Sequence, residues 1–372
     1  MKHFQLDSID KGDLIAVAMS GGVDSSVAAA LMVEAGYNVI GITLQLYDQG
    51  EMAKRKGACC AGQDIYDAKM VADKLGFPHY VLDYESIFKQ QVIEDFVDSY
   101  SKGETPIPCI QCNQKVKFKD LLKTAKDLGA KALVTGHYVK RLQGNTKSEL
   151  HRAVDYNRDQ SYFLFTTTQE QLDYLRFPLG GIPKSETREH AKRFDLQIAD
   201  KPDSQDICFV PNGNYVSVIE KLKPGALEPG DITHVDGTIL GRHEGTIQYT
   251  IGQRRGLGIS SKEPLYVVRI NPEHKQVIVG TKEHLAVHDI YLKDVNLLEN
   301  ATLFKDGYEC SVKIRSTHAP VKATVLVNAD NIKHARVHFE NPEYGVANGQ
   351  ACVFYKNDRV LGGGWITEKQ YL

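Results

Sequence analysis

Two groups of residues in this chain have the types and spacing that chemistry requires. The first is the segment 19–26, MSGGVDSS, where two glycines, three serines and an aspartate stand together. Amides of a glycine turn and serine hydroxyls bind anions, and a helix starting there adds the positive end of its dipole. The segment therefore predicts a phosphate-binding site, although any Gly-Gly turn can also simply join a strand to a helix. It is not a Walker A loop, because it lacks the lysine of GxxxxGK[ST].

The second group consists of cysteines. Cys109 and Cys112 form a CxxC motif that two prolines precede, and Cys208 follows 96 residues after Cys112 (208 − 112). A zinc site would need a second CxxC pair, which the sequence lacks. A redox or nucleophilic role is consistent with a helix that follows the motif and lowers a thiol pKa. Taken alone, each cysteine is interpreted as structural, as are the adjacent Cys59 and Cys60.

The elements that must position these residues follow from the apolar pattern. The run 14–18 is typical of a buried strand, and 25–35 has the apolar face of a helix. Further strands at 37–46, 79–82 and 132–137 alternate with helices at 64–75, 87–100 and 116–128, and a charged helix follows at 186–194. This alternation predicts an α/β fold with a doubly wound parallel sheet. Residues 103–113, which contain the CxxC motif, are expected to form a loop.

Beyond about residue 210 the residue pattern of the sequence changes: glycine and proline become frequent, and short β-rich runs recur. Such spacing, about every 8–12 residues, predicts small all-β modules with a barrel at the C-terminal end. Cys310 and Cys352 lie in these runs and are expected to be core residues. The expected strands are 246–251, 265–270, 276–279, 308–314, 322–327, 335–339 and 351–355.

Composition restricts the class of protein. Hydrophobic residues make up 42% and charged residues 25% of the 372 positions, and the net charge is −2, as in an ordinary globular protein of two or three domains. This balance neither indicates nor excludes nucleic-acid binding. No apolar run reaches the roughly 18 residues of a membrane span, and the start has no signal or transit character, so a cytoplasmic location is expected. Seven cysteines are more consistent with reactive thiols than with a disulfide framework.

The glycine turn resembles the PP-loop of the N-type ATP pyrophosphatases, whose signature is SGGxDS. That family holds the pyrophosphate of ATP and activates an oxygen by adenylation. The resemblance implies ATP as the nucleotide, with Asp24 helping to arrange the phosphates and Mg²⁺. ATP cleavage turns an oxygen into a leaving group, and a thiolate or persulfide is a suitable nucleophile to displace it. The two groups of residues together therefore indicate sulfur chemistry.

Further motifs narrow the resemblance. TPIPCIQCN, GHY, RDQSYF, DSQDICF, YTIGQRRGLG and LGGG occur in this order between residues 105 and 364. With the PP-loop, they resemble the tRNA-specific 2-thiouridylases, which replace O2 of the wobble uridine with sulfur. The resemblance spans nearly the whole chain. It implies a PP-loop domain at 1–209, a small central tRNA-contacting domain at 210–280 and a C-terminal β-barrel at 281–372.

The resemblance also implies a site, residue by residue. Cys208 would receive sulfur as a persulfide from a donor protein, and Cys112 would attack it, releasing sulfide or closing a disulfide with Cys208. The implied ATP-binding residues are Ala18, Met19, Ser20, Gly21, Gly22, Val23, Asp24, Ser25, Leu44 and Gly136. The implied contacts to the target base are Ile107, Pro108 and Cys109, and those to tRNA are His137, Arg158, Asp159, Gln160, Arg315, Ser316 and Gln350.

One position departs from the family and keeps an alternative open. Some relatives carry aspartate where this chain has Cys109, so an acid–base role there is in doubt and a third thiol is present. Cys109, Cys112 and Cys208 could instead hold an iron–sulfur cluster; no other metal site is expected.

Other functions also stay open. Another PP-loop enzyme, such as a 4-thiouridine enzyme, a lysidine synthetase or an amide-forming ligase, would share the glycine turn, and the ligases would not need the cysteines. A non-catalytic RNA-binding or iron–sulfur scaffold would leave that turn unexplained. Arg254 and Arg255 could contact phosphates or simply be solvated.

Overall fold

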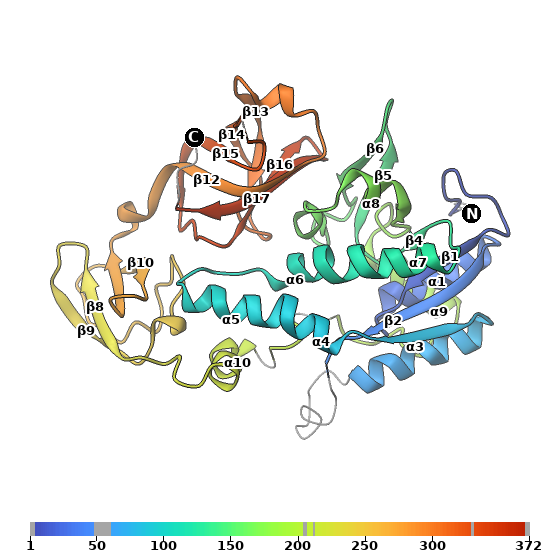
Figure 1. Cartoon of the computed structure of the whole chain (residues 1–372), viewed down its shortest axis with the longest axis horizontal. Helices are drawn as coiled ribbons and strands as arrows, with labels where there is room; N and C mark the ends of the chain where they lie inside the picture. Colours follow the sequence, from blue (N-terminus) through green and yellow to red (C-terminus); the bar gives the residue numbers. More distant parts are fainter. Residues whose placement is uncertain (1–3, 48–60, 204–206, 211–212, 329–330, 369–372) are drawn as a thin grey trace. The chain divides into compact units, whose positions relative to one another are not determined.

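The computed structural model describes residues 4–47, 61–203, 207–210, 213–328 and 331–368. It contains two compact units (Figure 1). The first comprises 1–92, 109–211 and 358–360, and the second comprises 93–108, 212–357 and 361–372. Cys59 and Cys60 lie outside the described residues.

The first unit is built on a parallel sheet whose strand order is β3-β2-β1-β4-β7. Every pairing in this sheet is parallel, and Ile15, Ala16 and Val17 of the central strand are fully buried, as expected for strands covered on both faces. The strands are β1 (Leu14–Ala18), β2 (Asn38–Gln45), β3 (His79–Asp83), β4 (Leu133–Val134) and β7 (Leu175–Arg176). The predicted α/β class is confirmed, although the strand expected at 132–137 contains only two residues.

Helices and one hairpin complete this unit. Helix α1 (Val23–Glu34) packs against α9 (Lys184–Arg193) and α3 (Ala61–Leu75), and its run of small residues, Ala28, Ala29 and Ala30, is buried. The other elements are α4 (Glu85–Phe88), α6 (Pro108–Gln111), α7 (Leu122–Asp127), α8 (Gln169–Tyr174), and the strands β5 (Val139–Gln143) and β6 (Ser148–Arg152).

The CxxC motif lies on a helix rather than in the expected loop. Proline is favoured at the first position of a helix, where its missing N–H costs nothing, and α6 begins at Pro108. A π-helical segment, Cys112–Leu121, then continues to α7. π-Helical turns are rare and are frequent at functional sites. The backbone of Cys109 and Cys112 is therefore helical.

The second unit contains two parts, each built around a β-sheet. In the first part, the strand order of the sheet is β10-β11-β8-β9. Helix α5 (Glu94–Ser101) follows a π-helical turn, and α10 spans Tyr215–Leu222. The rings of Tyr100 on α5 and Tyr215 on α10 stack with centroids 4.8 Å apart. The strands are β8 (Gly230–His234), β9 (Ile239–His243), β10 (Tyr266–Asn271) and β11 (Gln276–Gly280). The strand expected at 246–251 was wrong, because Thr246–Gln248 forms a 3₁₀ turn.

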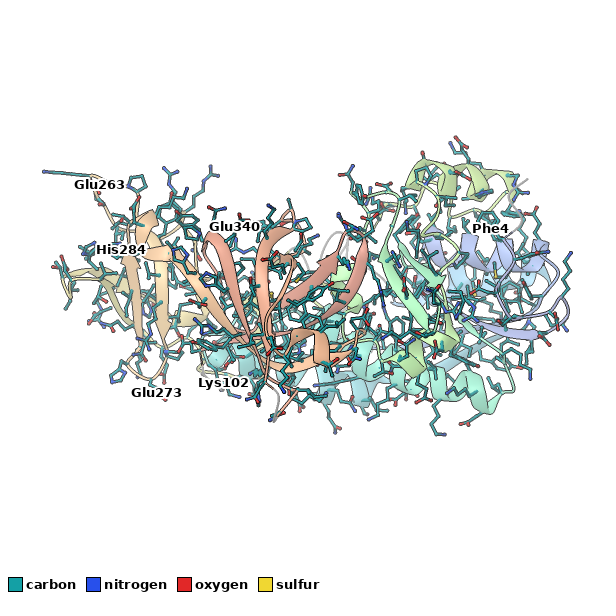
Figure 2. The ribbon with its side chains drawn as sticks, turned by 90° about the horizontal axis from the view of Figure 1, so that it is seen from above. Phe4, Lys102, Glu263, Glu273, His284 and Glu340 are labelled. Carbon is teal, nitrogen blue, oxygen red and sulfur yellow. The ribbon has the colours of Figure 1, made fainter. Side chains whose placement is uncertain are left out.

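The second part is a closed barrel, in which β12 pairs with both β15 and β17. Buried Val337 and Phe339 alternate with exposed neighbours such as Glu340, which lies on the outside of the barrel (Figure 2). Cys352 is fully buried and Cys310 packs against the same core, as predicted. The strands are β12 (Ala286–Leu297), β13 (Tyr308–Lys313), β14 (Val321–Val327), β15 (Ala335–Tyr344), β16 (Ala351–Lys356) and β17 (Arg359–Thr367). In the described part of the chain, no helix is long and apolar enough to cross a bilayer.

Candidate active site

The segment 19–26 forms a strand-to-helix turn, which we call the phosphate cradle. Gly21 adopts a φ of +71°, and a Cβ atom there would lie 2.1 Å from the carbonyl oxygen of Asp64, so only glycine fits. The Ser20 amide donates to Ser25 Oγ at 3.1 Å, and Ser26 Oγ donates to the Gly22 carbonyl at 2.9 Å. The turn is thus fixed by its own serines. It leads into the N-terminus of α1, which begins at Val23, and such an N-terminus can bind an anion.

The cradle lies where the strand order reverses, between β1 and β4. In open α/β sheets, ligands bind at the carboxyl ends of the strands at this switch point. After β4, Gly136 approaches the cradle so closely that a Cβ atom would lie 2.7 Å from the Ser25 nitrogen. Leu44, half-buried near the end of β2, pairs with Leu82 of β3. The structure therefore brings the cradle and Gly136 together, with Leu44 on the strand beside β1.

Asp24 is the charged centre of the cradle and has partners that sequence reasoning missed. The Tyr138 hydroxyl donates to Asp24 Oδ1 at 2.8 Å, and Lys184 Nζ lies 2.6 and 2.8 Å from its two oxygens. Desolvation, followed by the charge of Asp24, raises the pKa of Tyr138, so the phenol stays protonated and able to donate. The GHY motif was a signal for Tyr138. Lys184 stands 160 residues from Asp24, and no local pattern connects them.

A second lysine ties the cradle to α3. Lys201 Nζ lies 3.0 Å from the Gly21 carbonyl oxygen, and it contacts Asp64 Oδ1 at 2.7 Å and Asp67 Oδ2 at 2.6 Å. This lysine therefore fixes the main chain of the cradle through two carboxylates of one helix. The sequence held no signal for this role beyond the charge itself.

The three thiols of Cys109, Cys112 and Cys208, here called the thiol group, all belong to the first unit. Cys112 is buried, whereas Cys109 and Cys208 are exposed. Desolvation raises the pKa of each thiol, and the charge of Lys117 acts against it in all three cases. Lys117, one further residue that sequence reasoning missed, is thus the cation that favours a thiolate in this group.

Cys208 lies in a turn that the two buried residues after it, Phe209 and Val210, hold in place. Phe209 and Val210 are buried, and the Phe209 ring packs edge-on against Phe88 with centroids 5.8 Å apart. The Val210 amide closes the turn on the Ile207 carbonyl at 2.9 Å. The two buried neighbours hold the chain, while Cys208 itself is an exposed residue.

The pH dependence of Cys208 reactivity should follow its raised pKa. Desolvation, then the neighbouring Cys112 and Cys109, raises the pKa of Cys208 to about 12. Below its pKa, the thiolate fraction grows tenfold per pH unit, and the thiolate is the nucleophile. We therefore expect the iodoacetamide alkylation rate of Cys208, followed by peptide mass spectrometry, to rise about tenfold per pH unit from pH 7 to pH 10. A plateau near pH 8 would contradict this environment.

The residues predicted to contact tRNA within the first unit have unequal exposure. Arg158 is partly exposed and forms an ion pair with Asp203 at 3.0 Å. Asp159, only 1% exposed, accepts from Ser161 Oγ at 2.8 Å and Arg152 Nε at 3.2 Å, so its carboxylate is used internally. Gln160 Oε1 accepts from the Tyr138 amide at 2.8 Å. This loop is therefore tied to the GHY segment.

His137 is neutral in this environment. Desolvation, then the charge of Lys117, lowers its pKa to about 3. Its Nδ1 lies 2.9 Å from the Thr135 hydroxyl, and its ring packs edge-on against Phe118. Any contact of His137 with RNA is therefore a hydrogen bond or a stacking contact rather than an ion pair.

The remaining predicted contacts belong to the second unit, except Cys109. Ile107 is half-buried and Pro108 is buried at the start of α6. Gln350 Nε2 donates to the Thr105 carbonyl at 2.8 Å, Arg315 Nη2 donates to the Gly345 carbonyl, and the Ser316 carbonyl accepts from Lys313 Nζ at 2.8 Å. Arg315 and Gln350 line one cavity of about 340 Å³. Its other lining residues are Thr105, Thr250, Ile251, Gly252, Gln253 and Ala347.

The described residues fit the two candidate metal groups, an iron–sulfur cluster and Mg²⁺, differently. Among the described residues, no three side chains of His, Cys, Asp or Glu gather so that they could hold a metal ion. The thiol group therefore does not fit a preformed iron–sulfur site. The HxxxH spacings at His284/His288 and His334/His338 form no such group either. For Mg²⁺, Asp24 offers one carboxylate of the kind this ion prefers beside nucleotide phosphates.

Comparison with known proteins is consistent with this architecture. Family models described as a tRNA methyl transferase HUP domain, a tRNA methyl transferase PRC-barrel domain and an aminomethyltransferase beta-barrel domain match residues 13–212, 219–281 and 287–366. The HUP and barrel descriptions agree with the parallel sheet and the closed barrel seen here.

Curated relatives match over the full chain. The "tRNA-specific 2-thiouridylase MnmA" of Rhodospirillum centenum is 58% identical over 378 residues, covering 100% of this chain and 95% of the relative. The protein of the same name from Rickettsia felis is 60% identical and covers 96% of this chain and 98% of the relative. This chain therefore belongs to the family of tRNA-specific 2-thiouridylases.

Proposed function

We propose that this protein catalyses the ATP-dependent 2-thiolation of the wobble uridine of tRNA. The observation that carries the proposal is the combination of a phosphate cradle at the sheet switch point with three thiols in the same compact unit. Neither feature alone requires thiolation. Together they provide activation of an oxygen and a nucleophile that can replace it. We assign these steps to residues 1–209, and tRNA contact in part to the central domain 210–280 and the barrel 281–372.

In the first step, the cradle holds the phosphates of ATP. The α1 N-terminus and the serine hydroxyls bind the anion, and Gly136 leaves room for the nucleoside. The uridine O2 attacks the α-phosphate, pyrophosphate leaves, and O2 becomes part of a leaving group. Bound Mg²⁺, held by the phosphates with Asp24, would neutralise charge on the departing pyrophosphate. Ile107, Pro108 and Cys109 would contact the target base.

In the second step, a sulfur-donor protein first leaves Cys208 as a persulfide. The terminal sulfur of this persulfide attacks C2 of the activated uridine, and AMP leaves with the former O2. The Cys112 thiolate then attacks the Cys208 sulfur, which releases the thiolated base and forms a Cys112–Cys208 disulfide. A dithiol reductant restores both thiols. Desolvation raises the pKa of Cys112, and the charge of Lys117 opposes this rise and so favours the attacking thiolate.

Methyl transfer is a second candidate, because the matching HUP model is described as a tRNA methyl transferase domain. Methylation would not require ATP cleavage or a cysteine pair. The cradle, in which Gly21 leaves no room for a Cβ atom, supports the thiolation proposal instead. A cytoplasmic location, where tRNA and ATP are available, is part of our proposal.

The test is nucleoside mass spectrometry of tRNA bearing an unmodified wobble uridine. The full-length protein is incubated anaerobically with tRNA, Mg-ATP, a persulfide donor and dithiothreitol. We expect 2-thiouridine and AMP in equal amounts, and no product without ATP. A methylated nucleoside with S-adenosylmethionine, and no 2-thiouridine with ATP, would overturn the proposal in favour of methyl transfer.

The loop at 252–256 offers a second place for tRNA. Arg254 and Arg255 are exposed, and no ion pair found among the described residues involves either. The loop is held by Gln253, whose Nε2 donates to the Arg255 carbonyl at 3.0 Å. The loop borders the cavity that Arg315 and Gln350 line. Two guanidinium groups that no described residue pairs with, on a fixed loop, are suited to phosphate contact.

Removal of both charges, Arg254→Gln with Arg255→Gln, should weaken tRNA binding about tenfold and reduce the slope of log K against log salt by about two. The control is Lys305→Gln with Lys322→Gln, two exposed charges on the barrel part. Filter binding at several salt concentrations measures both quantities. An unchanged slope would show that the loop is merely solvated.

A further inference from the structure

The phosphate cradle lacks the lysine of a Walker A loop, but the fold brings one to it. Lys184 is the first residue of α9, and its Nζ lies 2.6 Å from Asp24 Oδ1 and 2.8 Å from Oδ2. Its side chain is only 10% exposed. Burial of an ammonium group is costly unless it is paired, so this contact is a built feature rather than a chance surface pair.

Lys184 is shared with a second carboxylate. Its Nζ lies 2.8 Å from Asp203 Oδ1, and Asp203 also contacts Arg188 at 3.2 Å and Arg158 at 3.0 Å. Desolvation raises the pKa of Asp203, but the hydrogen bond from Lys184 and the charges of Lys184, Arg158 and Arg188 outweigh it and hold the pKa below its usual value. Asp203 is therefore an anion that competes with Asp24 for Lys184.

The position of Asp24 creates an electrostatic problem for a triphosphate. An ionised carboxylate in an anion-binding turn repels the ligand unless a cation neutralises it, and until Mg²⁺ arrives with the nucleotide that cation must come from the protein itself. Tyr138 donates a neutral hydrogen bond to Asp24 and cannot supply that charge. Lys201 contacts the Gly21 carbonyl and the carboxylates of α3. Among the residues that the structure describes, Lys184 is thus the cation in direct contact with the cradle carboxylate.

We propose that Lys184 is a positioning residue for the triphosphate of the nucleotide: it fixes the Asp24 carboxylate and supplies the positive charge that the cradle sequence lacks. This inference rests on the proposed function, since it assumes a nucleoside triphosphate in the cradle. Lysine suits the task because its ammonium acts as a compact point charge toward phosphates.

A purely structural role is the competing explanation. Lys184 begins α9, which packs against α1, so the ion pairs could serve only to join these elements and the segment at Asp203. The two explanations differ in their dependence on ligand charge. A charge effect weakens ATP far more than adenosine, whereas a distorted scaffold weakens both alike.

The experiment measures binding of Mg-ATP and of adenosine to the full-length protein by titration calorimetry. We expect Lys184→Gln to raise the ATP dissociation constant at least about tenfold, the scale of a lost charge-assisted bond, with less than threefold change for adenosine. Lys184→Arg should recover most of the ATP affinity. Lys192→Gln, an exposed lysine of the same helix, is the charge-matched control and should bind ATP as the unmodified protein does.

Asp203→Asn gives a second, opposite test. It removes an anion that competes for Lys184, so ATP binding should be equal or tighter, whereas a structural network predicts weaker binding. If Lys184→Gln does not fold, Asp203→Asn alone decides. If Lys184→Gln weakens the binding of ATP and of adenosine equally, or weakens neither, the inference is overturned. In that case, 2-thiouridine formation by the unmodified protein still supports the proposed function. Failure of the unmodified protein to bind ATP overturns both.

Discussion

Replacement of Cys208 by serine should reduce 2-thiouridine formation from a persulfide donor on the order of 1000-fold or more, the scale of loss when an essential nucleophile is removed. A serine hydroxyl cannot carry the persulfide, and the exposed turn gives the donor access to Cys208 in the native chain. ATP binding should be unchanged, because Cys208 is not part of the cradle. Nucleoside mass spectrometry measures the product, and calorimetry measures ATP binding.

The neighbouring thiols separate the two sulfur mechanisms. Cys112→Ser should leave persulfide on Cys208 without a disulfide, which intact-protein mass spectrometry detects. Cys109→Ser should retain most activity by the persulfide route, whereas a cluster with three thiolate ligands would lose it. Cys310→Ser, a half-buried thiol of the barrel with a raised pKa, is the matched control. The persulfide proposal would be contradicted if Cys109→Ser were inactive and if iron reconstitution raised the activity of the native protein but not that of Cys109→Ser.

Gly136→Ala should reduce AMP formation on the order of 100-fold, because small displacements of a positioned substrate cost that much. The added Cβ would lie 2.7 Å from the Ser25 nitrogen and 2.8 Å from the Asp24 carbonyl carbon, which real Cβ atoms do not approach. Either the segment that follows β4 or the start of α1 must shift, and we propose that both border the nucleotide. Pyrophosphate release at saturating tRNA is the measurement.

Gly181→Ala is the matched control for this substitution. A Cβ at Gly181 meets no atom within 4 Å, so this variant of the same unit should behave as the native chain does. Thermal unfolding of both variants separates a local effect from a loss of folding. Full activity of Gly136→Ala would show that the close approach of Gly136 to the cradle is not needed for adenylation.

The sequence by itself determined much of the architecture. The alternating apolar runs at 14–137 specify parallel strands and helices because their period is local, and the structure confirms the α/β class. The strand, glycine turn and helix around segment 19–26 were also readable, since this local form depends on short-range backbone geometry, whereas phosphate binding there stays a prediction. The family followed from motifs spread over the chain, and the comparisons confirm it.

Predictions of secondary structure from local patterns were wrong where the same residue types are compatible with two backbone conformations. Residues 246–251 are β-rich in composition, but the 3₁₀ turn at Thr246–Gln248 places Ile247 in the interior. The prolines before the CxxC motif suggested a loop, although proline is equally suited to begin a helix, as Pro108 does. The short β4 shows that an apolar run need not be paired along its whole length.

Only the tertiary structure decided which distant charges meet. Lys184 and Asp203 look like ordinary surface residues in the sequence, yet the packing of α9 on α1 buries the lysine against Asp24, and Asp203 draws three cations together. Lys117 is likewise one of many lysines until the π-helical turn sets it near the thiols. Coulomb energies depend on distance and burial, which the order of residues does not contain.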